Sequence, residues 1–172
     1  MIYLASKADF PIFASRNNFS FAAVDPILSG ALMNENFIHH YRSSFKNLNQ
    51  REKESLLVLA DSWEIEAGEI VLEAGYLSHQ LYIIVEGSVA MTCNDSEITS
   101  LGVGDIFGES AFVNGEGELF SFVTEEETVL LTIDFSFIAK LARLSSYFAG
   151  RFGTSISECL SRKLEIFEAK LC

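Results

Sequence analysis

Short apolar runs separated by glycines fill the middle of this sequence and restrict its fold more than any other feature. From Glu66 onward the runs read EIVLEAG, QLYIIVEGSVAMTC, SEITSLGVGDIFG, LFSFVTEE and ETVLLTIDF. They are rich in Val, Ile, Thr, Tyr and Phe, which strands favour, and turn signals recur about every 8 to 12 residues. This spacing is typical of an all-β sandwich or roll, so we predict a β-roll here.

The segments on both sides of the predicted roll show a helical period. Before it, NQREKESLLVLADSWE places its apolar residues in a helical arrangement, with Asn49 as the expected cap three residues ahead of Glu52. After the roll, apolar side chains recur every three or four residues along one long helix. This stripe consists of Phe148, Phe152, Ile156, Leu160, Leu164, Phe167 and Leu171.

The C-terminal stripe allows two arrangements. The helix can fold back on its own roll, or the stripe can form a coiled-coil-like seam between two subunits. Because the stripe is longer than one small roll can cover, we predict a homodimer whose seam runs from Phe152 to Leu171. Gly153 weakens the helix in both arrangements.

Together these patterns predict an α+β fold, with an eight-stranded β-roll or jelly roll, flanking N-terminal helices and a long C-terminal helix. A length of 172 residues with 49% hydrophobic residues fits one domain with helical extensions. We divide the chain into a mostly helical extension (1–44), the roll (45–138) and C-terminal helices for dimerisation (139–172). The sequence assigns no role to residues 1–44.

Charge is distributed unevenly along the chain. Between Lys53 and Lys140 there are 17 Asp and Glu residues and no Lys or Arg, whereas all 12 bases lie in the flanks. Because nucleic-acid binding needs clustered cations, this distribution excludes it for the roll. The acidic face is either ordinary solvated surface or a means of selecting a protein partner with a basic surface.

Scattered cysteines and histidines argue against a metal centre or a disulfide framework. Cys93, Cys159 and Cys172 are odd in number, and His79 is the only histidine of the roll. We therefore expect reduced cysteines, no metal and no cofactor. The chain has no run of the roughly 18 uncharged apolar residues that a membrane helix needs. Since no signal peptide precedes the N-terminal region either, we expect a cytoplasmic protein.

The order of these elements resembles a known family. GEIVLEAGYLSHQLYIIVEGSVAM followed by LGVGDIFGESAF is similar to the cyclic nucleotide-binding domain of protein kinase A regulatory subunits, gated channels and bacterial catabolite activators. The resemblance covers roughly Phe45 to Leu171. It implies that Gly104–Phe122 is a phosphate-binding cassette, in which the amides of a short helix face a cyclic phosphate.

The resemblance also assigns roles within this cassette. Gly108 lets the backbone approach the sugar, Glu109 accepts from the ribose 2′-hydroxyl, and Ser110 and Ala111 are further candidate ligand-binding residues. The family's arginine, nine residues after the glutamate, pairs with the phosphate, but Glu118 stands there in this sequence. Ser121, where the family often has threonine or serine, keeps a hydrogen-bonding group.

Replacing that arginine with a glutamate should be costly for a phosphate ligand. Losing a charge-assisted contact costs about 1.5–3 kcal/mol, and a carboxylate at about 4 Å from the phosphate adds a few kcal/mol of repulsion. Rescue would need Arg143, Arg151 or another cation of the flanks to fold over the pocket. Four apolar side chains are candidates to close the pocket or simply to form core: Phe112, Leu119, Phe120 and Phe122.

These observations favour a non-enzymatic regulatory or protein-interaction module that does not bind cyclic AMP or cyclic GMP in the usual way. The alternative is a sensor of a cyclic nucleotide, or of another uncharged or cationic molecule, that signals through its C-terminal helix. An enzyme is disfavoured because His79 lacks the partners that metal catalysis on a β-roll requires. No helix-turn-helix follows the long helix before Cys172, so we do not expect DNA binding.

Overall fold

The structure, a computed structural model, describes residue 30 and residues 34–171. Most of the predicted extension over 1–44 lies outside the described residues; the described part of it contains helix α2 (Glu35–Ser44). Among the described residues no helix is long and apolar enough to cross a membrane.

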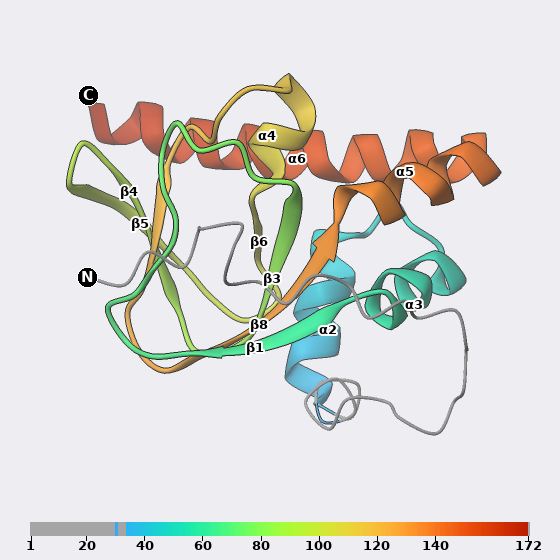
Figure 1. Ribbon diagram of the computed structural model, residues 1–172, viewed down its shortest axis with the longest axis horizontal. Coiled ribbons are helices and arrows are strands. Elements are labelled where there is room, and N and C mark those ends of the chain that lie inside the picture. The colour runs from blue at the N-terminus through green and yellow to red at the C-terminus, as the bar shows by residue number, and fades with distance from the viewer. Residues whose placement is uncertain (1–29, 31–33, 172) are drawn as a thin grey trace.

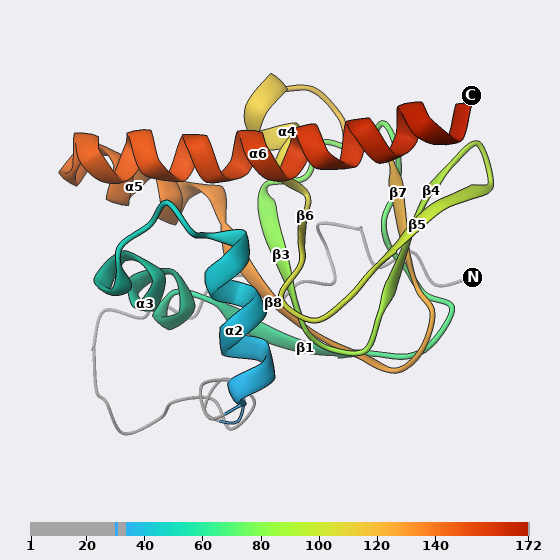
Figure 2. The ribbon, with the colours of Figure 1, turned by 180° about the vertical axis from the view of Figure 1, so that it is seen from behind.

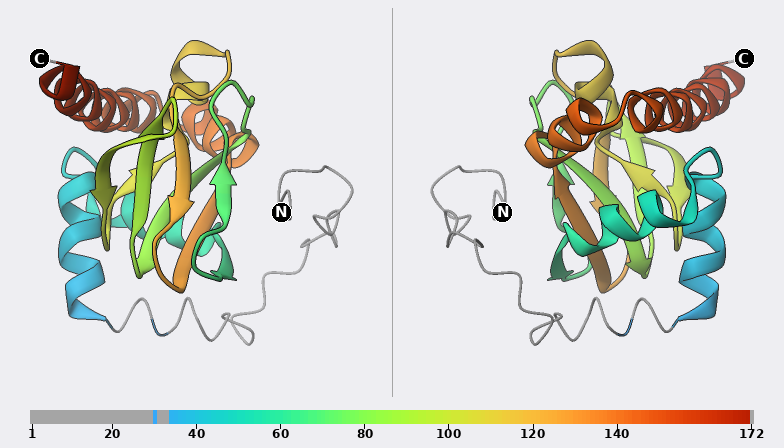
Figure 3. Two further views of the ribbon diagram at one scale, coloured as in Figure 1. Left: turned by 90° about the vertical axis from the view of Figure 1, so that its left-hand side faces the viewer. Right: turned by 90° about the vertical axis from the view of Figure 1, so that its right-hand side faces the viewer.

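Eight strands in the described residues form two antiparallel four-stranded sheets, in the orders β1-β8-β3-β6 and β2-β7-β4-β5. The strands are β1 (Asp61–Ile65), β2 (Ile70–Leu72), β3 (Gln80–Glu86), β4 (Val89–Cys93), β5 (Ser96–Leu101), β6 (Ile106–Phe107), β7 (Ser121–Thr124) and β8 (Thr128–Asp134). Figure 3 shows the strands side by side in the roll, with helices at its ends and flank. The predicted eight-stranded roll with flanking helices is confirmed.

The strands of the roll begin earlier than the sequence pattern indicates, which placed the first of them after Glu66. Helix α3 (Gln50–Val58) ends before the DSWEI segment, which forms β1 rather than the last turn of a helix. This strand pairs with β8, with Trp63 opposite Leu130. Because that pairing joins segments far apart in the sequence, local helical periodicity did not reveal it.

The N-terminus of α3 carries the predicted cap. Asn49 Oδ1 accepts from the Glu52 amide at 3.0 Å, and the Asn49 amide donates to Glu52 Oε2 at 2.8 Å. This reciprocal capping box satisfies two amide groups that the helix itself leaves without partners. The expected start of the helix is therefore confirmed.

The apolar side chains form two buried clusters. One lies between the two sheets, where the rings of Tyr82, Phe107 and Phe122 stack with centroids 4.8 and 4.7 Å apart. The other lies under the helices, where Phe45 and Phe148 pack on either side of Phe152. The long C-terminal helix contributes to both clusters.

Helix α5 (Phe135–Leu144) is followed by α6 (Ser146–Leu171), which crosses the whole length of the molecule. Figures 1 and 2 show α6 lying across the roll and the helices, beside the short helix α4 (Glu109–Asn114). A bidentate pair between Arg151 and Glu52 joins α6 to α3. These contacts fix the long helix to its own chain.

The predicted seam along α6 is therefore divided. Phe152 and Ile156 are buried within their own chain, with 3% and 1% of their surface exposed. Leu164 and Phe167 are half-buried against the roll, and Leu171 is 71% exposed. The alternative in which the helix folds back on its own chain describes Phe152, Ile156, Leu164 and Phe167, whereas a dimer seam including Leu160 and Leu171 stays a prediction.

Candidate functional site

The cassette begins with a glycine that the local geometry requires. Gly108 lies at the N-cap of α4 with a φ of 86°, a left-handed conformation that disfavours other residues. A Cβ at this position would lie 2.7 Å from Gln80 O and 2.8 Å from Tyr82 Cδ2. The backbone thus approaches β3 closely and turns directly into the short helix.

The carboxylate of Glu118 occupies the start of this helix. The side chain is buried, with only 4% of its surface exposed. Its Oε1 accepts from the Ala111 amide at 3.1 Å, and its Oε2 accepts from the Ser110 hydroxyl. Amide groups at the beginning of a helix attract anions, and here an acidic side chain of the same chain supplies the anion.

Backbone contacts hold Glu118 in this position. Its amide donates to Tyr76 O at 2.9 Å, and its carbonyl accepts from the Gly75 amide at 2.8 Å. The preceding residue, Gly117, packs so tightly that a Cβ there would lie 2.2 Å from Gly75 O. The loop that follows α4 is therefore fastened to the β2–β3 loop, and the Glu118 side chain is directed inward.

A lysine of the long helix reaches the other carboxylate of the cassette. Lys163 Nζ donates to Glu109 Oε1 and to Ile106 O, both at 2.6 Å. The side chains of Lys163 and Glu109 are only 7% and 2% exposed. The ammonium also lies 5.7 Å from the centroid of the Phe122 ring. Lys163 thus neutralises the buried Glu109 from within the chain.

Sequence reasoning missed Lys163. It considered Arg143 and Arg151 as cations that could fold over the pocket, but Arg151 pairs with Glu52 on α3. A signal was present, because Lys163 follows buried Cys159 by four residues and precedes Phe167 by four. These spacings place it on the same face of the helix as the apolar stripe, where a lysine needs a buried partner.

Two properties of the buried carboxyl groups of Glu109 and Glu118 determine what they can bind. Burial raises the pKa of Glu118 above its ordinary range, against the opposing effect of the hydrogen bonds from Ser110 and Ala111. Within the described residues Glu109 Oε2 has no hydrogen-bond partner, although it is buried. The cassette therefore contains two buried carboxyl groups, and one oxygen of these, Glu109 Oε2, can still accept a hydrogen bond.

The remaining predicted residues lie in different surroundings. Ser121 Oγ accepts from the Ala74 amide at 2.9 Å, in the neighbouring loop. Phe112 packs against Phe135 and Phe152 in the helical cluster, and Leu119 is 44% exposed. Phe112 thus forms core, one of the two roles expected for it, whereas exposed Leu119 has neither role. Two other aromatic side chains are buried inside the roll, Phe120 and Phe122.

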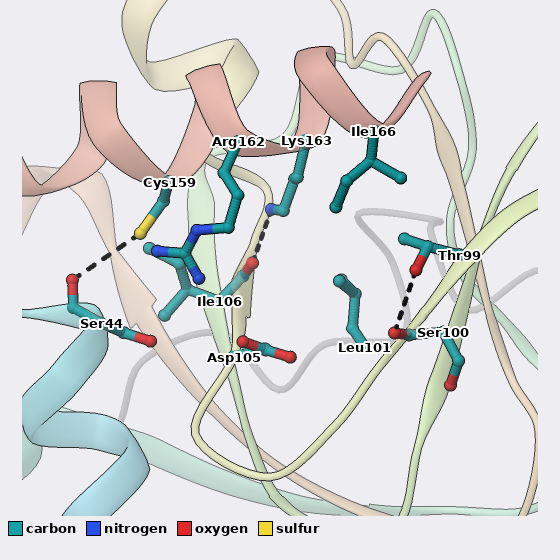
Figure 4. A pocket seen from close by; sticks show the side chains of 10 residues that line it. All are labelled: Ser44, Thr99, Ser100, Leu101, Asp105, Ile106, Cys159, Arg162, Lys163 and Ile166. Atoms are coloured by element: carbon teal, nitrogen blue, oxygen red, sulfur yellow. Dashed lines mark hydrogen bonds between the residues drawn. The ribbon is translucent and has the colours of Figure 1, made fainter. Parts of the chain in front are cut away.

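A cavity of about 110 Å³ lies on the other side of Lys163, between α6 and the β5–β6 region. Figure 4 shows Arg162 and Lys163 descending from α6 toward Asp105 and Ile106, with Cys159 directed at Ser44. Cys159 Sγ is 3.7 Å from Ser44 O. Glu118 does not line this cavity, so it is separate from the anion position of the cassette.

The searched part of the chain, which is limited to the described residues, contains no group of three or more His, Cys, Asp or Glu side chains that could hold a metal. His79 is exposed, and its carbonyl accepts from the Phe135 amide that begins α5. Cys93 is a half-buried free thiol. These two residues do not converge on the cassette residues Glu109 and Glu118.

The arrangement defines a class of domain: a β-roll that carries a short anion-facing helix and is crossed by a long C-terminal helix. Residues 62–144 match the family model described as the cyclic nucleotide-binding domain. This part of the chain is therefore similar to the cyclic nucleotide-binding domain family.

Solved structures with the same fold include bacterial and eukaryotic proteins. A putative cyclic nucleotide-binding protein from Geobacter metallireducens GS-15 is 14% identical with a TM-score of 0.64, over 77% of this chain and 99% of that chain. The catabolite activator protein of Thermus thermophilus is 23% identical with a TM-score of 0.60, over 74% of this chain and 61% of that one.

A third similar structure is the regulatory subunit of a cAMP-independent protein kinase A from Trypanosoma brucei. It is 24% identical with a TM-score of 0.59, over 82% of this chain and 51% of that chain. A triple mutant of the same subunit, with one substitution to arginine, has been solved with cAMP bound in its A site. At these identities the similarity shows the fold alone.

Proposed function

We propose that this chain is a non-enzymatic regulatory or protein-interaction module whose cyclic nucleotide-binding fold does not bind cyclic AMP or cyclic GMP in the usual way. The observation that carries the proposal is the buried Glu118 carboxylate, which accepts from Ala111 and Ser110 at the start of α4. The groups that would hold a cyclic phosphate are already engaged by the chain itself.

A cyclic phosphate would first have to displace this carboxylate. A displaced Glu118 would still be close to the phosphate, and two unit charges about 4 Å apart repel by a few kcal/mol at an effective dielectric constant near 20. A repulsion of that size weakens binding by roughly two or more powers of ten. The chain has no Lys or Arg between Lys53 and Lys140, and the Lys163 ammonium that reaches the cassette is already paired with Glu109.

The pairing of Glu109 with Lys163 is a second obstacle. A ligand hydroxyl that bound Glu109 Oε1 would compete with an ammonium that is held at 2.6 Å by the same polypeptide. The tether gives the lysine a high effective concentration, so a weakly bound ligand does not displace it.

The Trypanosoma brucei subunit supports this view by analogy. The unmodified protein is called cAMP-independent, and the form with three substitutions, one of them to arginine, holds cAMP. On this fold, three substitutions thus occur together with bound cAMP. We infer that the glutamate at position 118 has a comparable effect here.

A small-molecule sensor is the second candidate function. It is favoured by Glu109 Oε2, which is buried and has no hydrogen-bond partner within the described residues. A carboxylate oxygen in this state accepts a hydrogen bond from an uncharged or cationic ligand, not from a phosphate. Such a ligand would act on α6 through Lys163.

The other parts of the proposal concern assembly and location. We propose a homodimer, a protein partner with a basic surface that fits the acidic roll, no binding to nucleic acid, and a cytoplasmic location. We also propose that 1–44, 45–138 and 139–172 act as extension, roll and dimerising helices. Support comes from the charge distribution and from the exposed acidic side chains of the roll.

Calorimetric titration with cyclic AMP and cyclic GMP tests the main proposal. The unaltered chain should show no binding at micromolar ligand, and the Glu118→Arg variant should gain affinity. Glu118→Gln is the matched control, because it keeps a hydrogen-bond acceptor but adds no cation. If Lys163 also blocks the site, a Glu118→Arg/Lys163→Met double variant should bind more tightly than Glu118→Arg alone. Micromolar binding by the unaltered chain would refute the proposal.

A further inference from the structure

Two exposed surfaces lie at separate places on this chain, and each combines apolar side chains with charged ones, acidic in one surface and basic in the other. The first, which we name the acidic tip, combines Leu77, Val113 and Leu119 with the acids Glu73 and Glu116. The second, which we name the basic corner, combines Leu144 and Tyr147 with Lys140 and Arg143.

The acidic tip is built from the end of α4 and from two loops that are joined by backbone hydrogen bonds. The Gly75 amide donates to Glu118 O at 2.8 Å, and the Glu118 amide donates to Tyr76 O at 2.9 Å. These bonds bring the segments around positions 77 and 119 together. The side chains of Leu77, Val113 and Leu119 are 43%, 52% and 44% exposed. The charged residues of these loops, Glu73 and Glu116, are exposed as well.

The basic corner is the turn between α5 and α6. Leu144 and Tyr147 are 84% and 77% exposed, more than any other large apolar side chain of the described residues. Lys140 lies 5.0 Å from the centroid of Phe137, and Arg143 is exposed in the last turn of α5. Positions 135–157 contain no Asp or Glu, so this corner carries only positive side chains.

We propose that the acidic tip of one copy of this chain binds the basic corner of a second copy. Exposed apolar side chains next to one another gain free energy when a partner covers them, and the opposite charges select this partner over a like-charged one. Anionic lipid and nucleic acid are poorer occupants of the tip, because Glu73 and Glu116 repel them. A two-fold dimer would make the contact twice, tip to corner and corner to tip.

The position of the two surfaces is compatible with such a reciprocal dimer. Figure 1 shows α4, α5 and α6 along the same edge of the molecule, so the tip and the corner both lie at that edge. The contact does not require Phe152 or Ile156, which are buried within their own chain. It therefore differs from the seam along α6 that the sequence predicts.

This inference rests on the interaction function proposed above, but its test measures mass rather than nucleotide binding. Sedimentation velocity of the full chain, up to about 200 µM and at low salt, should show a dimer. Leu144→Asp should weaken the dimer about tenfold or more, since it removes apolar contact at the centre of the interface. Leu171→Asp is the control: it changes a leucine that is 71% exposed, against 84% for Leu144, and that lies outside both surfaces but within the predicted seam along α6, so the pair of variants distinguishes the two interfaces.

Charge reversal provides the second arm. Glu116→Lys and Arg143→Glu should each weaken the dimer several-fold, and the double variant should regain affinity because the two charges are exchanged. High salt should weaken the contact as well. The proposal is overturned by a monomer throughout the range, by a larger effect of Leu171→Asp than of Leu144→Asp, or by no recovery in the double variant. Circular dichroism verifies that each variant is folded.

Discussion

Lys163 of the long helix and Glu109 of the cassette form a buried ion pair, with Nζ and Oε1 2.6 Å apart. Lys163→Met removes the cation and leaves a buried carboxylate without a partner, which should lower the free energy of unfolding by about 3–5 kcal/mol. Urea denaturation measures this change. The Glu109→Gln/Lys163→Met double variant should recover part of the loss, because no uncompensated charge remains.

Lys170→Met is the control for the lysine substitution. Lys170 lies on the same helix but is exposed, and its contact with Glu97 O is 3.5 Å long. Its replacement should change stability by less than about 0.5 kcal/mol. Equal effects of the two substitutions would show that the Glu109 pair does not stabilise the fold.

The raised pKa of Glu118 predicts a pH dependence of stability. The folded state binds a proton at Glu118 more readily than the unfolded state does, since burial disfavours the charged form. This contribution is fully present below the ordinary carboxyl pKa and is lost as pH rises through the raised value. Stability measured by urea denaturation from about pH 4 to 7 should therefore fall less in Glu118→Gln than in the unaltered chain.

Glu116→Gln is the matched control for this comparison. Glu116 is exposed and only two residues away, so its replacement removes a neighbouring carboxyl group that is not buried and shows whether burial at position 118 causes the effect. Glu52 contributes with the opposite sign, because its hydrogen bond with Arg151 lowers its pKa. The quantity to compare is therefore the difference in unfolding free energy between each variant and the unaltered chain at each pH. Parallel profiles for Glu118→Gln and the unaltered chain would contradict the prediction.

Gly117 should not tolerate a side chain. Its Cβ would lie 2.2 Å from Gly75 O, a backbone atom that cannot rotate away. Gly117→Ala should destabilise the fold by about 1–3 kcal/mol by separating the two loops. Gly102→Ala is the control, since no atom lies within 4 Å of its Cβ position. Thermal unfolding compares the two, and equal midpoints would argue against the close contact.

Gly153 should be replaceable with a gain in stability. It lies inside α6, and no heavy atom lies within 4 Å of its Cβ position. Because glycine in a helix costs roughly 0.5–1 kcal/mol relative to alanine, Gly153→Ala should raise the unfolding free energy by about that amount. Gly150→Ala has the same surroundings and should behave alike. A loss of stability in either variant would indicate an unrecognised contact on this face of α6.

Local signals were sufficient to predict much of the fold. The Asn49 and Glu52 pair marks the start of α3 because a capping box depends only on residues three positions apart. Glycine-bounded runs likewise predicted the strands after Glu66. The first strand was missed because Trp63 is placed by its pairing with Leu130 of β8, a contact between distant segments.

The candidate site could be predicted only in part. The position of Glu118 follows from its distance to Glu109 along the chain, so its place in the cassette was expected. The hydrogen bond that its side chain accepts from the Ala111 amide was not expected, because that bond depends on how the loop folds back over α4. Lys163 is 54 residues from Glu109 in the sequence, and only the folded position of α6 brings the two together.

The Glu118 carboxylate differs from a ligand in one respect: it is covalently part of the loop that it contacts. Its concentration at the start of α4 is set by the chain itself, so a nucleotide has to compete with a tethered carboxylate. Under the proposed main function, the state of the amides at the start of α4 follows the ionisation of Glu118 and the folding of its loop. An input then reaches this domain through protonation, through its outer surface or through a force on α6.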